Sequence, residues 1–170
     1  MEIKYNLTED DYINFNMFHI RNSKSAMRSL KIQRFAVPII YIILPFVFPN
    51  ALDSTFIFTL ITFFIVSILW VVFYPKYFYK SVNRRLKKMI KEGKNEGLIG
   101  EHKLITTVEG ITDTTSYGET KVNWSGIKSL KEDSDYLYIY NSSVSAYILP
   151  KRDLKDVEQI RDYLNSRIPE

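Results

Sequence analysis

Two long uncharged runs, residues 35–52 and 54–75, dominate the hydropathy pattern of this chain, and a single acid, Asp53, separates them. Within the second run, residues 56–74 would form a helix roughly 28 Å long, at about 1.5 Å per residue. This length matches the hydrocarbon core of a bilayer. Apolar runs of this length are seldom found in the core of a soluble domain. The pattern therefore predicts a membrane protein with two closely spaced spans.

The first run is the weaker of the two predicted spans because it contains proline. Pro38 and Pro45 lie inside residues 35–48. A proline in the middle of a helix frees a backbone carbonyl and bends the helix, which membrane helices tolerate where a neighbour satisfies the backbone. Since only residues 49–55 join the runs, we predict a tight transmembrane hairpin. The alternative is one span together with a re-entrant or interfacial segment.

Charge is strongly segregated along the chain, although the formal net charge is only +4. Between residues 21 and 94 the basic residues flank the apolar runs on both sides, and the only acids are Asp53 and Glu92. The loop between the runs contains no lysine or arginine. The positive-inside rule therefore predicts that both termini are cytoplasmic and that residues 50–55 lie outside.

Residues 76–91 follow the second span with helical periodicity, and Gly93 is placed to end the helix. One stripe of this segment is apolar and another is basic. The predicted contacts with anionic lipid are Lys80, Arg84, Arg85, Lys87, Lys88 and Lys91. The charges can instead serve only to orient the hairpin, and both interpretations can hold together. Nucleic-acid binding is disfavoured because the cluster would lie against the membrane and no nucleic-acid motif accompanies it.

The N-terminal residues predict a strand followed by a helix. Glu2–Leu7 alternates between polar and apolar residues, as a half-buried strand does. Thr8 and Asp11 form an acidic version of the capping box, which opens a helix over residues 9–31. We expect the strand to join the sheet that the chain forms after Gly100, because that later module is small for an independent core.

After Gly100 the pattern changes to period two, which predicts an antiparallel sheet. The expected strands lie near residues 103–108, 111–117, 120–124, 127–131, 136–140 and 144–149. In Tyr136–Tyr140 we expect Leu137 and Ile139 to face one side and the three tyrosines the other. Asp153 is expected to cap a final amphipathic helix. The apolar stripe of that helix consists of Leu154, Val157, Ile160 and Leu164.

The predicted fold class is an α+β membrane protein in which a two-helix transmembrane hairpin is inserted in a cytoplasmic antiparallel β domain closed by a C-terminal helix. The expected parts are a strand and helix (residues 1–31) that pack with the C-terminal domain, the hairpin (32–75), a basic cytoplasmic helix (76–95) and the β domain (96–170).

The sequence offers no recognisable catalytic or cofactor chemistry. The absence of cysteine excludes thiol catalysis, disulfides and cysteine-ligated zinc. His19 and His102 are isolated in the sequence, with no His or carboxylate at metal-ligand spacing, and no phosphate-binding or nucleophile motif is present. The acids of residues 132–135 are expected to be solvated in a turn. We therefore expect a protein that is not an enzyme and has no cofactor or metal.

Several short motifs carry a family resemblance, and their order and spacing matter more than any one of them. They are Leu7–Tyr12 (LTEDDY), Gly110–Thr112 (GIT), Val122–Ile127 (VNWSGI), Tyr136–Tyr140 (YLYIY) and Ala146–Leu154 (AYILPKRDL). Together with the hairpin, they resemble the YcxB-like family of small bacterial membrane proteins. The resemblance implies a bacterial cell membrane location and a C-terminal barrel of the pleckstrin-homology (PH) type, capped by a helix. It implies no activity.

Trp124 and Pro150 lie at recurring positions of that family. One interpretation makes them part of a ligand or partner surface. The other is structural: a strand tryptophan that packs beneath the closing helix, and a proline that ends the last strand.

The function we expect is a membrane-anchored, non-catalytic binding module that docks a protein partner or anionic lipid at the inner leaflet. The alternative is a small channel or transporter subunit built from oligomerising hairpins. The spans hold few small residues for close helix packing, and neither contains an ionisable residue. The small residues are Ala36, Ala51, Ser54 and Ser67. The expected partners are the lipid bilayer, a cytoplasmic protein and a second copy of the chain, but not nucleic acid.

Overall fold

The computed structural model describes residues 1–47, 54–92 and 97–168. The chain forms two compact units. The β unit consists of Met1–Asn16 and Lys87–Glu170, and the helical unit consists of Met17–Leu86. The structure is therefore of the α+β class, with two long apolar helices and antiparallel sheets in the C-terminal part.

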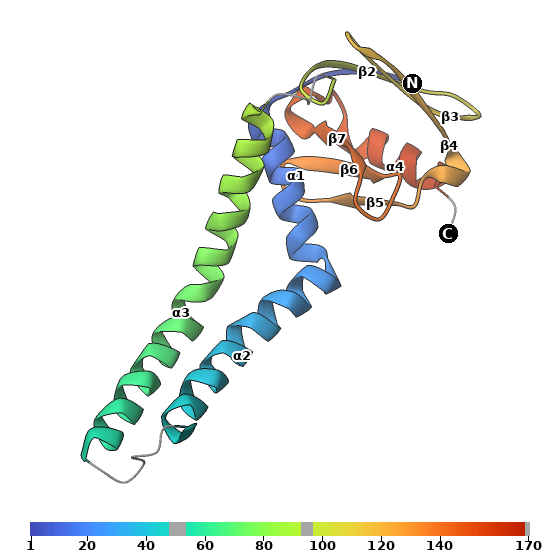
Figure 1. Ribbon diagram of the computed structural model, residues 1–170. Coiled ribbons are helices and arrows are strands. Elements are labelled where there is room, and N and C mark those ends of the chain that lie inside the picture. The colour runs from blue at the N-terminus through green and yellow to red at the C-terminus, as the bar shows by residue number, and fades with distance from the viewer. Residues whose placement is uncertain (48–53, 93–96, 169–170) are drawn as a thin grey trace. The chain divides into compact units, whose positions relative to one another are not determined.

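The β unit contains two antiparallel sheets (Figure 1). Strands β1-β2-β3-β4 form one sheet and strands β5-β6-β7 form the other, in those orders. The strands are β1 (Glu2–Leu7), β2 (Gly100–Thr106), β3 (Gly110–Thr115), β4 (Gly118–Asn123), β5 (Ser129–Glu132), β6 (Tyr136–Tyr140) and β7 (Ala146–Pro150). Hydrophobic side chains between these strands form the core, where Leu104, Leu137 and Leu149 are fully buried.

The N-terminal strand does join the later sheet. β1 pairs with β2 in antiparallel register, with Ile3 opposite Leu104 and Tyr5 opposite His102. The inward positions of β1 are Ile3, Tyr5 and Leu7, as the alternation of the sequence predicts. Residues on the two sides of the hairpin in sequence thus build one sheet.

β6 coincides with its predicted range, but both of its faces are buried. Leu137 and Ile139 lie on the core side. The tyrosine side is covered by α1 (Glu9–Asn22), where the ring of Phe15 contacts those of Tyr138 and Tyr140. The sequence predicts which residues share each face of β6 but not what covers the tyrosine face, because period-two reasoning sees only the strand itself and not the helix that packs on it.

Two helix boundaries also differ from the prediction. Residues 9–31 do not form one helix, because α1 ends at Asn22 and α2 (Lys24–Val47) begins after Ser23. The Ser23 Oγ accepts from the Ala26 amide at 3.3 Å.

At the C-terminus, residues 151–153 form a 3₁₀ turn. Asp156 caps α4 (Val157–Arg167) by accepting from the Gln159 amide at 2.9 Å, so Asp153 is not the cap.

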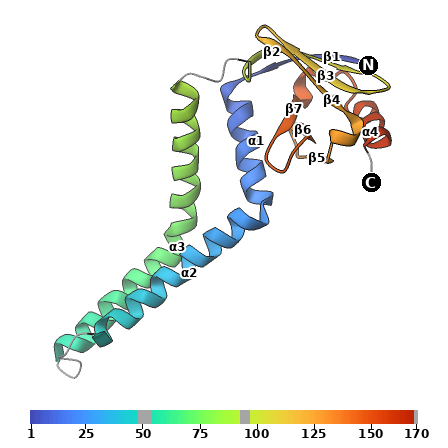
Figure 2. The ribbon, with the colours of Figure 1, turned by 45° about the vertical axis from the view of Figure 1, so that its right-hand side comes forward.

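The helical unit consists mainly of α2 and the first part of α3 (Ser54–Lys91), which lie side by side (Figure 2). Arg34 Nε donates to the carbonyl of Val71 at 2.9 Å, and Trp70 Nε1 donates to that of Gln33 at 3.3 Å. Tyr41 contacts the rings of Trp70 and Phe63, so it packs against α3.

α3 continues as a helix through Pro75 up to Lys91. The segment 76–91 is therefore an extension of the second apolar helix, as its periodicity predicts. Residues 50–53 of the predicted loop lie outside the described residues, and the last two residues of that loop have helical backbone. The predicted helix stop at Gly93 also lies outside the described residues.

Candidate functional site

The basic residues predicted to contact lipid form one face of α3. All six are exposed, and they are Lys80, Arg84, Arg85, Lys87, Lys88 and Lys91. At about 100° per residue, all of them except Arg85 fall within a sector of about 100° on the helix surface, and Arg85 lies about 60° outside it. Lys88 also forms an ion pair with Glu92 at 3.4 Å. We call these six residues the basic face.

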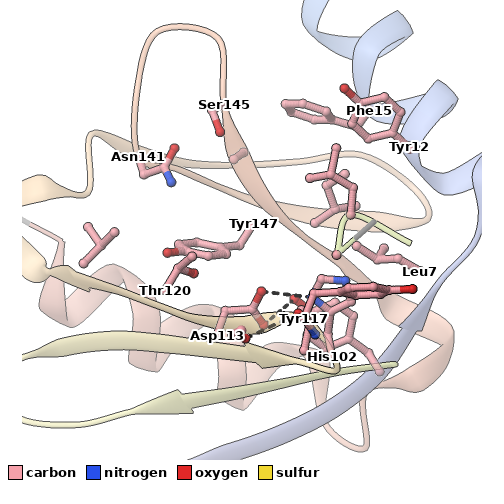
Figure 3. A pocket seen from close by; sticks show the side chains of 18 of the residues that line it. Leu7, Tyr12, Phe15, His102, Asp113, Tyr117, Thr120, Asn141, Ser145 and Tyr147 are labelled. Atoms are coloured by element: carbon pink, nitrogen blue, oxygen red, sulfur yellow. Dashed lines mark hydrogen bonds and ion pairs between the residues drawn. The ribbon is translucent and has the colours of Figure 1, made fainter. Parts of the chain in front are cut away.

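A second candidate site is a cavity of about 880 Å³ in the β unit (Figure 3). Buried residues of β1, β2, β3 and α1 line its inner end, among them Tyr5, Phe15 and His102. Exposed residues of the β3–β4 turn and the β6–β7 loop, among them Tyr117 and Val144, line its mouth. The cavity thus leads from solvent to the inner surface of the four-stranded sheet.

Three buried polar side chains meet at the inner end of this cavity. His102 Nδ1 lies 2.9 Å from Asp113 Oδ2, and the Tyr5 hydroxyl donates to Asp113 Oδ1 at 3.3 Å. The rings of Tyr5 and His102 stack with centroids 5.1 Å apart. Burial and the neighbouring carboxylate raise the pKa of the Tyr5 hydroxyl, so it stays protonated as a donor.

His102, which stands isolated in the sequence, therefore has a carboxylate partner in the fold, because β2 and β3 bring it against Asp113. Their alternation places both residues at inward positions of neighbouring strands, but the pairing depends on the register, which sequence alone does not specify. A histidine oriented by a carboxylate is two parts of a nucleophilic triad. His102 Nε2, however, has no hydrogen-bond partner within the described structure, so no nucleophile completes it.

Asp11 links the start of α1 to the segment after β7. Its carboxylate accepts from Arg152 Nη1 and Nη2 at 2.7 and 2.6 Å, and from the Tyr136 hydroxyl at 2.7 Å. The Thr8 amide donates to Asp11 Oδ2 at 2.8 Å and the Asp11 amide donates to Thr8 Oγ1 at 3.3 Å, which are the two bonds of the predicted capping box, and the Thr8 hydroxyl also donates to Asp11 Oδ2 at 2.8 Å. Burial by itself would raise the pKa of Asp11, but the hydrogen bonds from Arg152, Tyr136 and Thr8 outweigh burial and lower it.

Other residues singled out in the sequence have structural contacts. Trp124 lies in a 3₁₀ turn rather than in a strand, but it does pack against α4, where its ring contacts Tyr163. Pro150 is the last residue of β7. Asp133 is not merely solvated, because its carboxylate accepts from the Tyr138 hydroxyl at 2.8 Å and from the Tyr136 amide at 2.8 Å. These contacts favour the structural interpretation of all three residues.

Within the described ranges, no group of three or more histidine or acidic side chains is placed to hold a metal ion. A family model described as YcxB-like protein matches residues 107–165. The resemblance to the YcxB-like family that the sequence motifs indicate is thus confirmed for this part of the chain. The YcxB-like match runs from the β2–β3 turn into α4 and includes Asp113, Trp124 and Pro150, but not the long apolar helices. No curated protein and no solved structure matches the chain.

Proposed function

We propose that the chain is a membrane-anchored, non-catalytic binding module of the bacterial cell membrane, with α2 and α3 as its two spans. The observation that carries this proposal is the exposure of the apolar helices. In the most apolar windows of α2 and α3, only 17% and 6% of the residues are buried, whereas a core helix of a soluble protein is mostly buried. Lipid is the solvent that suits such a surface.

The basic face supports an orientation with both termini in the cytoplasm. It lies on the same continuous helix as the second span and follows the apolar segment directly. The end of the basic face nearest the span, at Lys80, would therefore lie near the lipid headgroups of the inner leaflet, where a basic residue contributes about 1 kcal/mol to binding anionic lipid. The role of the basic face in this proposal is to hold the cytoplasmic domain close to the membrane.

We assign the β unit to a PH-like fold within this proposal. Its antiparallel sheets of four and three strands, followed by a C-terminal helix, support the assignment. β4 forms an edge of the four-stranded sheet and is largely exposed. An exposed edge strand can pair with an extended segment of another protein, which is the docking mode that we propose for a cytoplasmic partner.

Reporter fusions test the topology. A reporter after Glu170 should report the cytoplasm, and a tag inserted within residues 50–53 should report the outside. If both positions report the same side, the two-span hairpin is wrong.

Lipid selectivity tests the basic face. The full chain is reconstituted in phosphatidylcholine bilayers that carry spin-labelled phosphatidylglycerol or phosphatidylcholine, and the relative association of the two labels is measured. The native chain should prefer phosphatidylglycerol. Replacing Arg84, Arg85, Lys87 and Lys88 by glutamine should abolish most of this preference. The matched control replaces four exposed lysines of the β unit by glutamine, which are Lys4, Lys121, Lys128 and Lys155.

Equal selectivity in the native chain and the basic-face variant would refute the lipid contact.

In-cell crosslinking with mass spectrometry tests the docking of a partner. A recurrent cytoplasmic protein linked to β4 supports the binding module. Self-crosslinks confined to the spans, together with solute flux in liposomes, would favour the channel or transporter subunit instead. Ser67, one of the few small residues available for such packing, already contacts α2 of its own chain.

A further inference from the structure

We propose that the cavity of the β unit binds a small organic ammonium compound with an apolar or aromatic body. This inference does not depend on membrane attachment, because every residue that carries it lies in the β unit. The ligand class follows from three properties of the cavity wall: its aromatic rings, its charge and its unpaired polar atoms.

The first property is the number of aromatic rings. Five aromatic side chains line the cavity, from its inner end to its mouth, and they are Tyr5, Tyr12, Phe15, Tyr117 and Tyr147. The face of an aromatic ring attracts a cation, and cages of such rings bind substituted ammonium groups. Tyr117 is mostly exposed at the mouth, so packing within the chain does not explain why an aromatic ring stands there.

The second property is charge. The described residues that line the cavity include Asp113 and Glu119 but no lysine or arginine, although basic residues exceed acidic ones in the whole chain. Lys121 stands outside the lining and pairs with Glu119 at 3.1 Å. The cavity therefore lacks the unpaired cations of the basic face, and an anionic headgroup that suits that face does not suit the cavity.

The third property is two buried polar atoms without partners. One of them, the Oδ1 atom of Asn141, can only accept a hydrogen bond, and the role of the other, His102 Nε2, depends on the tautomer of the ring. Nε2 and the Oδ1 atom of Asn141 are buried without a hydrogen-bond partner, and both residues line the cavity. A ligand that reaches the Asn141 oxygen by displacing neighbouring side chains must supply an N–H or O–H donor, which an ammonium group has.

The test is an NMR titration of the full chain in maltoside micelles, since choline-based detergents carry a quaternary ammonium cation that would compete for the aromatic rings. The chain has only two histidines, so the His102 ring signals report the cavity and the His19 signals serve as an internal control. The probes are 2-phenylethylammonium, 2-phenylethanol and 3-phenylpropionate, which share a phenyl ring and differ in charge. The cation should shift the His102 signals saturably, the alcohol more weakly and the carboxylate least, while His19 stays unchanged.

Variants locate the binding. Tyr117→Ala removes an exposed ring at the mouth and should weaken binding of the cation by roughly two- to fivefold. Val108→Ala, at an exposed position on the β2–β3 turn away from the cavity, should leave binding unchanged. Equal or tighter binding of the carboxylate, no saturable shift of His102 with the cation, or equal effects of the two variants would each overturn the proposal.

Discussion

The β unit and the helical unit distribute their apolar side chains in opposite ways. In the β unit, Leu104, Leu137 and Leu164 are fully buried, and large exposed apolar residues occur mainly at turns. In the helical unit most apolar side chains of α2 and α3 are exposed, while the polar side chain of Ser67 is buried and bonded to backbone carbonyls. If α2 and α3 face lipid, as we propose, the difference teaches that an exposed apolar side chain has a different meaning in each unit.

The largest expected contrast comes from the same truncation in each unit. Leu164→Ala removes a side chain that is 0% exposed and should lower the free energy of unfolding of the β unit by about 2–5 kcal/mol. Leu69→Ala, at a position 49% exposed on α3, should have a much smaller effect. Unfolding by sodium dodecyl sulfate in mixed maltoside micelles measures both, with Trp124 fluorescence in a Trp70→Phe background for the β unit and far-ultraviolet circular dichroism for the helices. Equal losses would show that the two units bury these leucines alike.

A charge placed on two exposed apolar positions sharpens the same contrast. Phe64 is 56% exposed near the centre of the apolar segment of α3, and Phe64→Lys should oppose insertion by about 2.5–3.5 kcal/mol. Val108→Lys, at 81% exposure on the β2–β3 turn, should change nothing that can be measured. The readout is the fraction of chain that stays in the membrane after alkaline carbonate extraction. Full retention of the Phe64→Lys variant would contradict the lipid-facing role of this side of α3.

The third prediction concerns the ion pair in the β unit. Arg152→Ala leaves the buried Asp11 without its cation and should cost about 1.5–3 kcal/mol of unfolding free energy. Because the pKa of Asp11 is lowered in the folded chain, its contribution is present above about pH 4, the unfolded value, and is lost as the pH falls below that.

Removing Arg152 should raise the pKa of Asp11 and move this acid loss to higher pH. Urea unfolding at several pH values between about 3 and 7 measures both effects. Lys155→Ala, which removes an exposed positive charge nearby in sequence, serves as the control and should leave the pH profile unchanged. A profile that Arg152→Ala also leaves unchanged would show that Arg152 does not set the pKa of Asp11.

Sequence reasoning succeeded where the deciding interactions are local. The limits of β6 follow from the alternation of its own residues, and the Thr8–Asp11 capping box follows from their spacing. The break at Ser23 was missed because helical periodicity continues on both sides of it. Serine is a good N-cap, so this residue was the available signal.

The contacts that build the candidate cavity and the ion pair are not local. Asp11 and Arg152 stand on opposite sides of the hairpin in sequence, and no spacing rule connects them. His102 and Asp113 are closer in sequence, but their contact depends on how the β2–β3 turn sets the register. The basic face, in contrast, follows from helical periodicity alone, which is why its residues were identified without the structure.

The smallest expected effect lies in the helical unit, at the buried hydroxyl of Ser67. The Ser67 hydroxyl lies 2.8 Å from the Phe63 carbonyl of its own helix and 3.4 Å from the Pro38 carbonyl of α2. A hydroxyl has one proton to donate, so the longer contact between the helices is the weaker one.

Ser67→Ala should therefore lower the stability of the helix pair by only about 0.6 kcal/mol, the average for such bonds in membranes. Thr62→Ala is the control, because Thr62 bonds only to the Phe58 carbonyl of its own helix. Unfolding by sodium dodecyl sulfate in mixed micelles measures both variants. If Ser67→Ala costs no more than Thr62→Ala, the hydroxyl does not join α2 to α3, and the close approach of the helices rests on the contacts of Tyr41 and Arg34 instead.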